Sequence, residues 1–194
     1  MPRSPSPPKH FYTLNEYFAL ERVGDARYEY YNGEIFCMSG GSEQHGRIAG
    51  NIFAELHSQL KKRRCEAFSA EIPIKTPTLP PYRYPDASVA CDQAQFEKIQ
   101  GIGLLTNPVL IVEVLSPQTE AFDRKEKFEA YKALESVREY LLVAQNAPHI
   151  TRFVRQETGE WKRFDVGSLD AILTLEAIDC QLALADVYAN VVFE

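Results

Sequence analysis

The chain has no long hydrophobic run. No stretch approaches the roughly 18 apolar residues that a membrane-spanning helix needs. The first ten residues, MPRSPSPPKH, lack the apolar core of a signal peptide. They are rich in proline and serine, so we expect residues 1–11 to form a disordered tail. These absences favour a cytoplasmic protein that does not bind membranes.

Cysteine and histidine are scarce, with four residues of each. The cysteines are Cys37, Cys65, Cys91 and Cys180, and the histidines are His10, His45, His57 and His149. The cysteines lie far apart and form no CxxC pair, which argues against a zinc ribbon and against a disulfide framework. The histidines lack the spacing of zinc ligands. We therefore expect a reduced protein without a histidine-rich zinc site.

Several common catalytic motifs are also missing. The sequence has no GxxxxGK phosphate loop, no GxSxG elbow, no HExxH pair, and no GxGxxG after a strand. This argues against P-loop, serine-hydrolase, zincin and dinucleotide-binding chemistry.

The composition is that of an ordinary globular domain, since 45% of the 194 residues are hydrophobic and 25% are charged. With no internal repeat and no linker, we expect one domain over residues 12–194. The net charge of −6 counts against a nucleic-acid partner, because phosphate binding normally uses a basic surface. Two local basic clusters soften this objection. They are Lys61, Lys62, Arg63 and Arg64, and Arg152, Arg155, Lys162 and Arg163. The first cluster can also be a solvated helix end, where cations complement the helix dipole.

The N-terminal third predicts a helix, a hairpin and a longer helix. Thr13 and Glu16 have the spacing of a capping box, so the first helix is expected to begin at Thr13. Asn32-Gly33 is the favoured pair for a two-residue type I′ turn between strands. A helix is expected from about Ser42 to Arg64, because its apolar residues recur at helical spacing. These residues are Ile48, Ile52, Leu56 and Leu60.

The remainder alternates strands and helices. Strands are expected at 68–75, 84–91, 108–116 and 139–145, with a helix at 119–134 between the last two. The run at 108–116, PVLIVEVLS, is typical of a strand covered on both faces. The strand–helix–strand order implies a right-handed crossover. A hairpin around Thr158-Gly159 and a short strand with a helix over 173–191 complete the chain. The predicted class is α/β, with a central mixed sheet flanked by helices.

Glu113 stands within this buried run, with apolar residues on both sides. An ionised carboxylate there costs several kcal/mol unless a cation or hydrogen bonds compensate it. It lies three residues before Ser116-Pro117, near a strand end, where sites tend to be built in open α/β sheets. The alternatives are a charge facing solvent from an edge strand and a charge paired with a buried arginine.

Asp86 follows Pro85, which lacks an N–H and therefore belongs at a strand edge or a bulge. The run from Ala87 to Cys91 then continues as a strand. A Pro-Asp pair alone carries little information. However, two strands that each hold one carboxylate can bring both within reach of a single hard cation such as Mg²⁺.

Lys127 supplies the third candidate. On a helix that turns about 100° per residue, one face carries Asp123, Lys127, Ala130, Tyr131 and Leu134. The opposite face carries Lys125, Glu126, Glu129, Lys132 and Ala133. Lys127 is thus the lysine in the middle of the inward face. It could cover the core with its alkyl stem while the ammonium reaches water. Next to two carboxylates, an inward ammonium can neutralise them and act on a phosphate.

Four further residues are supporting candidates. His45 shares the face of the apolar residues of its helix and lies in the first turn, where anions are favoured, so it can meet a phosphate or support the site. A core histidine with its own hydrogen bonds explains the same position. Glu29 and Glu34 lie on the expected hairpin, and Tyr131 lies one turn beyond Lys127.

Several motifs follow one another along the chain: a hairpin with NGE, SxxH opening a helix, YPD, VEVLSPxT, DxxxK followed by a tyrosine, and EYLLV. This order resembles the Uma family of restriction-endonuclease-like proteins, within the PD-(D/E)XK nuclease superfamily. The similarity extends from about Tyr12 to Val192. Its most specific part is VEVLSPQTEAFDRKEKFEAY.

The resemblance implies a restriction-endonuclease-like core and hydrolysis of phosphodiester bonds with Mg²⁺ or Mn²⁺. It places the catalytic acids at Asp86 and Glu113. The superfamily motif has a lysine two residues after the glutamate, where this chain has Leu115. In the family, the role of that lysine passes to the following helix, here Lys127.

We expect Asp86, Glu113 and the Val114 carbonyl to bind one or two divalent cations that activate a water. Lys127 would orient this water or offset charge on the phosphate. The expected substrate is a nucleic acid, taken to be DNA. Two alternatives stay open, an inactive nuclease-fold module that binds or self-associates and a hydrolase of a small phosphorylated metabolite. Leu115 and the acidic charge favour the first alternative, and the resemblance also suggests a homodimer.

Overall fold

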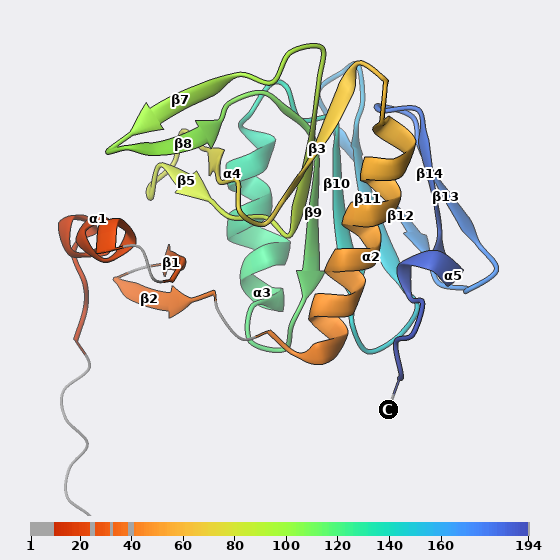
Figure 1. Cartoon of the computed structure of the whole chain (residues 1–194), viewed down its shortest axis with the longest axis horizontal. Coiled ribbons are helices and arrows are strands. Elements are labelled where there is room, and N and C mark those ends of the chain that lie inside the picture. Colours follow the sequence, from red (N-terminus) through yellow and green to blue (C-terminus); the bar gives the residue numbers. More distant parts are fainter. Residues whose placement is uncertain (1–9, 24–25, 32, 39–40, 194) are drawn as a thin grey trace, which may run out of the picture. The chain divides into compact units, whose positions relative to one another are not determined.

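The computed structural model describes residues 10–23, 26–31, 33–38 and 41–193 (Figure 1). The chain divides into two compact units, Met1–Gly40 and Gly41–Glu194, and each is described by itself. Residues 1–9 of the expected tail lie outside the described part, and the single domain expected from residue 12 onward stays a prediction. Of the helices described, none is long and apolar enough to cross a membrane.

The first unit holds one helix and one hairpin. They are α1 (Leu14–Val23), β1 (Tyr28–Tyr31) and β2 (Glu34–Cys37). The predicted capping box is present, because the Thr13 N–H donates to the Glu16 carboxylate at 2.6 Å and the Glu16 N–H donates to the Thr13 hydroxyl at 3.3 Å. The ends of β1 and β2 pair directly, so the hairpin has the predicted two-residue connection. Gly33 has φ +84°, and Asn32, the other turn residue, lies outside the described residues.

A six-stranded mixed sheet forms the centre of the second unit, in the order β12-β11-β10-β9-β6-β3. Its strands are β3 (Cys65–Ser69), β6 (Ala87–Cys91), β9 (Pro108–Leu115), β10 (Glu139–Ala144), β11 (Ile150–Arg155) and β12 (Trp161–Val166). β9 and β10 run parallel, and the other neighbours run antiparallel. The helix between β9 and β10 is therefore a crossover. The predicted α/β class with a central mixed sheet is confirmed.

Helices cover both faces of this sheet (Figure 1). α2 (Glu43–Leu60) packs on one face. The crossover helix packs on the other and consists of α3 (Glu120–Phe122), η1 (Asp123–Lys127) and α4 (Phe128–Lys132). The helix predicted at 119–134 is thus confirmed to within two residues.

The side chains of β9 alternate between the two cores. Val112 and Val114 belong to the core under α2, whereas Ile111 and Leu115 belong to the core under α4. β9 is therefore covered on both faces, as its nearly continuous apolar sequence predicted. The same alternation puts Glu113 on the face covered by the crossover helix.

Three predicted boundaries are wrong. The strand expected at 84–91 begins only at Ala87, because Pro85 has no N–H to donate to a neighbouring strand. α2 ends at Leu60 and not at Arg64, because Lys62 takes φ +70° and turns the chain into β3. The single strand predicted at 68–75 is divided between β3 and β4 (Ile74–Lys75) by a tight turn.

A second sheet, of order β5-β4-β8-β7, was not predicted. Besides β4, its strands are β5 (Tyr82–Arg83), β7 (Phe96–Ile99) and β8 (Ile102–Leu105). Gln100 and Gly101 both have positive φ, 51° and 91°, and close the β7–β8 hairpin. A Gln-Gly pair is a weaker turn signal than Asn-Gly, so the hairpin was not predicted from these residues.

The C-terminal region is partly as predicted. β11 and β12 form the expected antiparallel hairpin around Gly159. Beyond it, the structure has a second hairpin and a short helix where one strand and a helix were expected. These elements are β13 (Ile172–Leu175), β14 (Cys180–Ala183) and α5 (Leu184–Val187). Asp179, with φ +50°, makes the turn into β14 that splits the segment.

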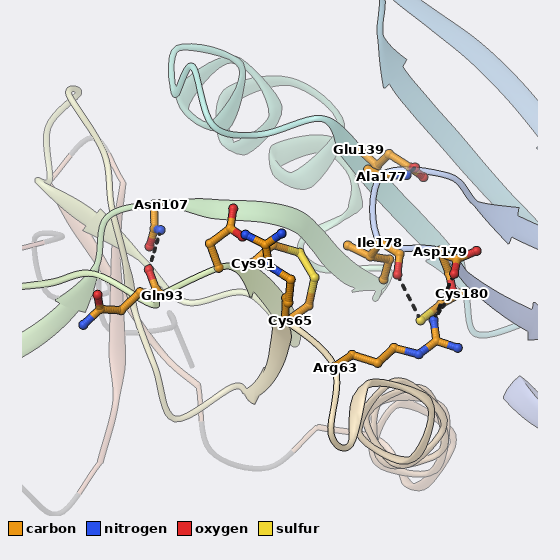
Figure 2. Close-up of a disulfide and its surroundings, with 12 residues drawn as sticks. Arg63, Cys65, Cys91, Gln93, Asn107, Glu139, Ala177, Ile178, Asp179 and Cys180 are labelled. Atoms are coloured by element: carbon orange, nitrogen blue, oxygen red, sulfur yellow. Dashed lines mark hydrogen bonds and ion pairs between the residues drawn. A yellow bond between two sulfur atoms is a disulfide. The ribbon is translucent and has the colours of Figure 1, made fainter.

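Cys65 and Cys91 form a disulfide (Figure 2), contrary to the expectation of a protein without one. The two residues are 26 positions apart in sequence. The antiparallel register of β3 and β6 nevertheless places them directly opposite each other, with Cα atoms 3.9 Å apart. Their pairing results from sheet register, which cysteine spacing alone does not reveal.

Candidate functional site

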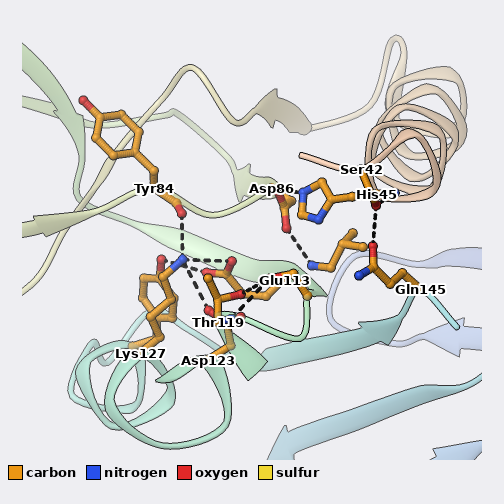
Figure 3. A network of polar contacts seen from close by, with 12 residues as sticks. Ser42, His45, Tyr84, Asp86, Glu113, Thr119, Asp123, Lys127 and Gln145 are labelled. Atoms are coloured by element: carbon orange, nitrogen blue, oxygen red, sulfur yellow. Dashed lines mark hydrogen bonds and ion pairs between the residues drawn. The ribbon is translucent and has the colours of Figure 1, made fainter. Parts of the chain in front are cut away.

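Glu113 and Lys127 form a buried ion pair between β9 and the crossover helix (Figure 3). The Lys127 ammonium donates to Glu113 Oε2 at 3.1 Å and to the backbone carbonyl of Tyr84 at 3.1 Å. It also lies 3.5 Å from Oδ1 of Asp123, one turn earlier on the helix. The side chains of Glu113 and Lys127 are each only 4% exposed. Lys127 thus points inward, as the helical pattern predicted, and its ammonium does not extend to water.

Tyr131 holds the other oxygen of Glu113. Its hydroxyl donates to Glu113 Oε1 at 3.2 Å, from the next turn of the helix. Both oxygens of Glu113 therefore have a donor within the chain. Each carboxylate oxygen has two lone pairs, so it can still accept a further ligand. Leu115, at the position where the resemblance would imply a lysine, is buried in the apolar core and offers no polar group.

Asp86 reaches the same stretch of β9 from β6. Its backbone N–H donates to the Val112 carbonyl at 3.0 Å, and its Oδ2 accepts the Val114 N–H at 2.6 Å. The carboxylate thus lies against the peptide unit that joins Glu113 to Val114. In a strand, the N–H and C=O of one residue face the same neighbour, so the Val114 carbonyl is also directed toward this side. Asp86, Glu113 and Val114 are therefore brought together.

His45 contacts the second oxygen of Asp86. Its Nε2 lies 2.9 Å from Asp86 Oδ1. The Ser42 hydroxyl caps α2 by accepting the His45 N–H at 3.1 Å, which fixes the residue in the first turn. Burial lowers the pKa of His45, but the hydrogen bond and charge of Asp86, with the charge of Asp123, outweigh this and raise the pKa above its ordinary value. His45 is therefore an Asp86 partner and not a residue of the apolar core.

Asp123 also belongs to this site. The helical pattern placed it on the inward face, but it was not named as a candidate site residue. It is 1% exposed. Burial raises its pKa, and the charge of Lys127 and a hydrogen bond from Thr119 offset this only in part. Its Oδ1 lies 3.5 Å from the Lys127 ammonium, beyond the ordinary hydrogen-bond distance, and has no hydrogen bond of good geometry. The four-residue spacing between Asp123 and Lys127, which places both residues on one helix face, was the sequence signal that could have identified Asp123.

A five-residue π-helical segment, Asp123–Lys127, carries both ends of this contact. Backbone hydrogen bonds of a π-helix span five residues, and such segments are rare and frequent at functional sites. The hydroxyl of Tyr140, on β10, donates to the Asp123 carbonyl at 2.9 Å. Lys127 and its neighbour Phe128 are both buried, so the inward face is wider than the α-helical pattern predicted.

The donor set fits a hard divalent cation. Among the described residues, no group of three or more His, Cys, Asp or Glu side chains is arranged to hold a metal. The Asp86 carboxylate nevertheless bonds the peptide unit that follows Glu113, and carboxylate and carbonyl oxygens of this kind suit Mg²⁺ or Mn²⁺ better than Zn²⁺. The orphaned, buried Oδ1 of Asp123 also shows that negative charge here is not fully compensated by hydrogen bonds.

The basic clusters of the sequence are occupied within the chain. Five of these side chains have partners: Arg63 with Asp179, Arg64 with Asp92, Arg152 with Glu139 and Glu176, Arg163 with Asp165, and Arg155 with the carbonyls of Lys132 and Leu134. Lys61 is the C-cap residue of α2. This position agrees with the alternative that the first cluster is a charged helix end. Arg152 and Arg155 are thus tied into the fold, whereas Arg63, Arg64 and Arg163 form exposed ion pairs that contribute little to stability.

Glu29 and Glu34 lie on β1 and β2, in the first compact unit. Glu29 is buried within the described structure. Their part in a site stays a prediction.

Comparisons with known proteins agree with this architecture. An uncharacterized protein of Synechocystis sp., slr1290, is 32% identical over 190 residues, which cover 98% of each chain. A second Synechocystis protein, sll1609, is 29% identical over 149 residues, 77% of this chain and 84% of its own length. The crystal structure of a putative nuclease belonging to DUF820 from Anabaena variabilis has a similar fold, with a TM-score of 0.67 and 20% identity over 87% of this chain and 93% of that chain. The model of the Uma2 family, described as putative restriction endonuclease, matches residues 14–185. The chain therefore belongs to the Uma2 family and has a nuclease-like fold.

Proposed function

We propose that this protein hydrolyses phosphodiester bonds of DNA with a divalent cation bound by Asp86, Glu113 and the Val114 carbonyl. One observation supports this most: the Asp86 carboxylate contacts the peptide unit directly after Glu113, whose own carboxylate is bonded to the buried ammonium of Lys127. Two acids from neighbouring strands and an amine from the next helix thus share one small region. Membership of the Uma2 family supports the same chemistry.

Each residue of the site has a distinct part. A Mg²⁺ or Mn²⁺ ion, when bound, lowers the pKa of a water and stabilises charge on the phosphate. His45 and the Val114 N–H fix the Asp86 carboxylate, and the Tyr131 hydroxyl fixes that of Glu113. Lys127 holds a positive charge beside Glu113 in a site shielded from water, where it can offset the negative charge that develops on a phosphate.

A cleavage assay tests this function. The purified full chain is incubated with supercoiled plasmid, single-stranded DNA and RNA, each with Mn²⁺, with Mg²⁺ and with EDTA. We expect cleavage of DNA that requires the cation, and a loss of about a hundredfold or more in Glu113→Gln, the scale typical of removing one charge-stabilising group. Glu129→Gln, at an exposed carboxylate on the crossover helix that carries Lys127, is the control and should cleave as the wild type does.

Absence of cleavage on every substrate, or an undiminished rate in Glu113→Gln, would overturn the catalytic proposal. Cleavage of RNA alone would replace DNA as the substrate. A generic phosphodiester, bis(p-nitrophenyl) phosphate, is included because turnover of it without cleavage of nucleic acid would point to a small phosphorylated substrate.

A catalytically inactive module of the same fold is the second candidate. Two observations favour it: Leu115 replaces the superfamily lysine, and both oxygens of Asp86 and of Glu113 already have donors within the chain. Such a module would bind Mn²⁺ weakly or not at all, and Asp86→Asn would not change that binding.

A further inference from the structure

Lys127 has two carboxylate neighbours at unequal distances. Its ammonium is hydrogen-bonded to Glu113 Oε2 at 3.1 Å, while Asp123 Oδ1 lies 3.5 Å away and makes no hydrogen bond. The Asp123 side chain is only 2% exposed, so its carboxylate is removed from bulk water. A movement of the ammonium by a few tenths of an ångström toward Asp123 would form that hydrogen bond.

The charges at the site are out of balance. When ionised, the carboxylates of Asp86, Glu113 and Asp123 carry three negative charges against the single positive charge of Lys127. Asp86, Asp123, Lys127 and His45 interact electrostatically with one another, and Glu113 pairs with Lys127. The excess of two negative charges equals the charge of one divalent cation. Such a cation and the ammonium of Lys127 would compete for Glu113, because both are positive.

We infer that Asp123 is a positioning residue of the site, which draws the Lys127 ammonium away from Glu113 and thereby keeps Glu113 available to a divalent cation. This inference rests on the proposed function only in that the cation binds at Glu113. Asp123 itself acts through Lys127 and not as a ligand.

The surroundings of Asp123 fit this part. Its backbone carbonyl accepts the Tyr140 hydroxyl, and its backbone N–H donates to the Thr119 carbonyl at 2.9 Å. An ordinary ion pair at the same spacing is available for contrast on the same helix. Glu120 and Arg124 pair at 2.8 Å with side chains 48% and 35% exposed, as expected of a pair that only stabilises the helix surface. The Asp123–Lys127 contact is buried and incompletely formed.

A double-mutant cycle on Mn²⁺ affinity tests the inference. Calorimetric titration is carried out on the wild type, Asp123→Asn, Lys127→Met and the double variant, with Glu129→Gln as control. We expect Asp123→Asn to weaken Mn²⁺ binding about tenfold, within the range of coupling between contacting side chains. In the Lys127→Met background, where no ammonium competes for Glu113, the same change should alter the affinity by less than about twofold. Glu129→Gln should bind as the wild type does.

The outcomes separate this inference from the proposed function. If the wild type binds Mn²⁺ and Asp123→Asn binds equally well, the inference alone fails. If Asp123→Asn weakens binding equally in both backgrounds, Asp123 acts as a ligand or by its field, and the inference also fails. If the wild type does not bind Mn²⁺, both fail.

A second measurement avoids dependence on the folding of Lys127→Met. Side-chain NMR of the lysine ammonium groups is recorded with and without Mg²⁺. The Lys127 signal should shift on Mg²⁺ addition in the wild type and shift at least twofold less at saturating Mg²⁺ in Asp123→Asn. An equal shift in both proteins would contradict the inference.

Discussion

At the scale of single residues, the site is governed by the cost of burying charge. Glu113, Asp123 and Lys127 are each almost fully buried. Removing a carboxylate from water is costly unless a cation or donors compensate it. Glu113 has two donors, whereas one oxygen of Asp123 has no hydrogen bond. Of the two carboxylates, Asp123 is therefore the one whose charge is less well compensated by hydrogen bonds.

This cost gives a prediction for the stability of the metal-free protein. Burial raises the pKa of Asp123 above its ordinary value of 3.8. As the pH rises above 3.8, the unfolded chain ionises this carboxyl more readily than the folded one, so folded stability falls until the raised pKa is passed. Asp123→Asn has no carboxyl group at this position, so its stability does not fall for this reason. Its stability relative to the wild type should increase between pH 3.5 and pH 7, measured by urea unfolding in EDTA.

If the stability of Asp123→Asn relative to the wild type instead decreased over this pH range, the attraction between the Asp123 carboxylate and the Lys127 ammonium would outweigh the cost of burial in the folded state. Glu129→Gln serves as the control, since its exposed carboxylate should give a nearly constant difference over the same range.

Some residues of the site could be predicted from the sequence and others could not. Lys127 could, because helical periodicity separates inward from outward lysines. Asp86 and Glu113 were predicted as site residues from their strand context and from the family resemblance. The importance of Asp123 could not be predicted, since a carboxylate four residues before a lysine is also the commonest pattern of a surface ion pair. Burial, which the sequence does not give, distinguishes the two cases.

At the scale of elements, β9 and the crossover helix position the site. β9 is buried on both faces, so its one carboxylate must face a core, and alternation directs it to the helix side. The apolar run and the helical period predicted both elements. The π-helical segment could not be predicted, because it depends on contacts such as that between the Tyr140 hydroxyl and the Asp123 carbonyl. The β7–β8 hairpin was missed because its turn residues are weak signals.

The disulfide is the element-scale feature that departs most from the sequence-based expectation. Cys65 on edge strand β3 is joined to Cys91 on β6, five residues after Asp86. Closing a loop of this length stabilises a protein by about 3 kcal/mol. We expect thiol labelling of the unfolded chain to detect two more thiols after reduction than before. Reduction, or Cys65→Ser, should lower the free energy of unfolding by about this amount.

Equal thiol counts with and without reductant would show that the two cysteines are not bonded in the purified protein. Cys180→Ser is a control for loss of a thiol outside the pair.

At the scale of the whole molecule, the net charge of −6 disfavours contact with a polyanion. Arginines of both basic clusters form ion pairs within the chain, with acidic partners such as Asp179, Asp92 and Asp165. A bound cation at the acidic site would therefore supply the main positive charge for a phosphate. Fold class and family were predictable, since a mixed sheet with crossover helices follows from the order of strands and helices. Partner, substrate and metal are not encoded in that order.

Mn²⁺ titration of the wild type, Asp86→Asn, Glu113→Gln and the double variant tests most directly whether the two acids form one metal site. We predict saturable binding to the wild type, a loss of at least about tenfold in each single variant, and no further loss in the double variant, because residues acting as one unit are not additive. Wild-type protein that does not bind Mn²⁺, or single variants that bind it with undiminished affinity, would contradict a shared site.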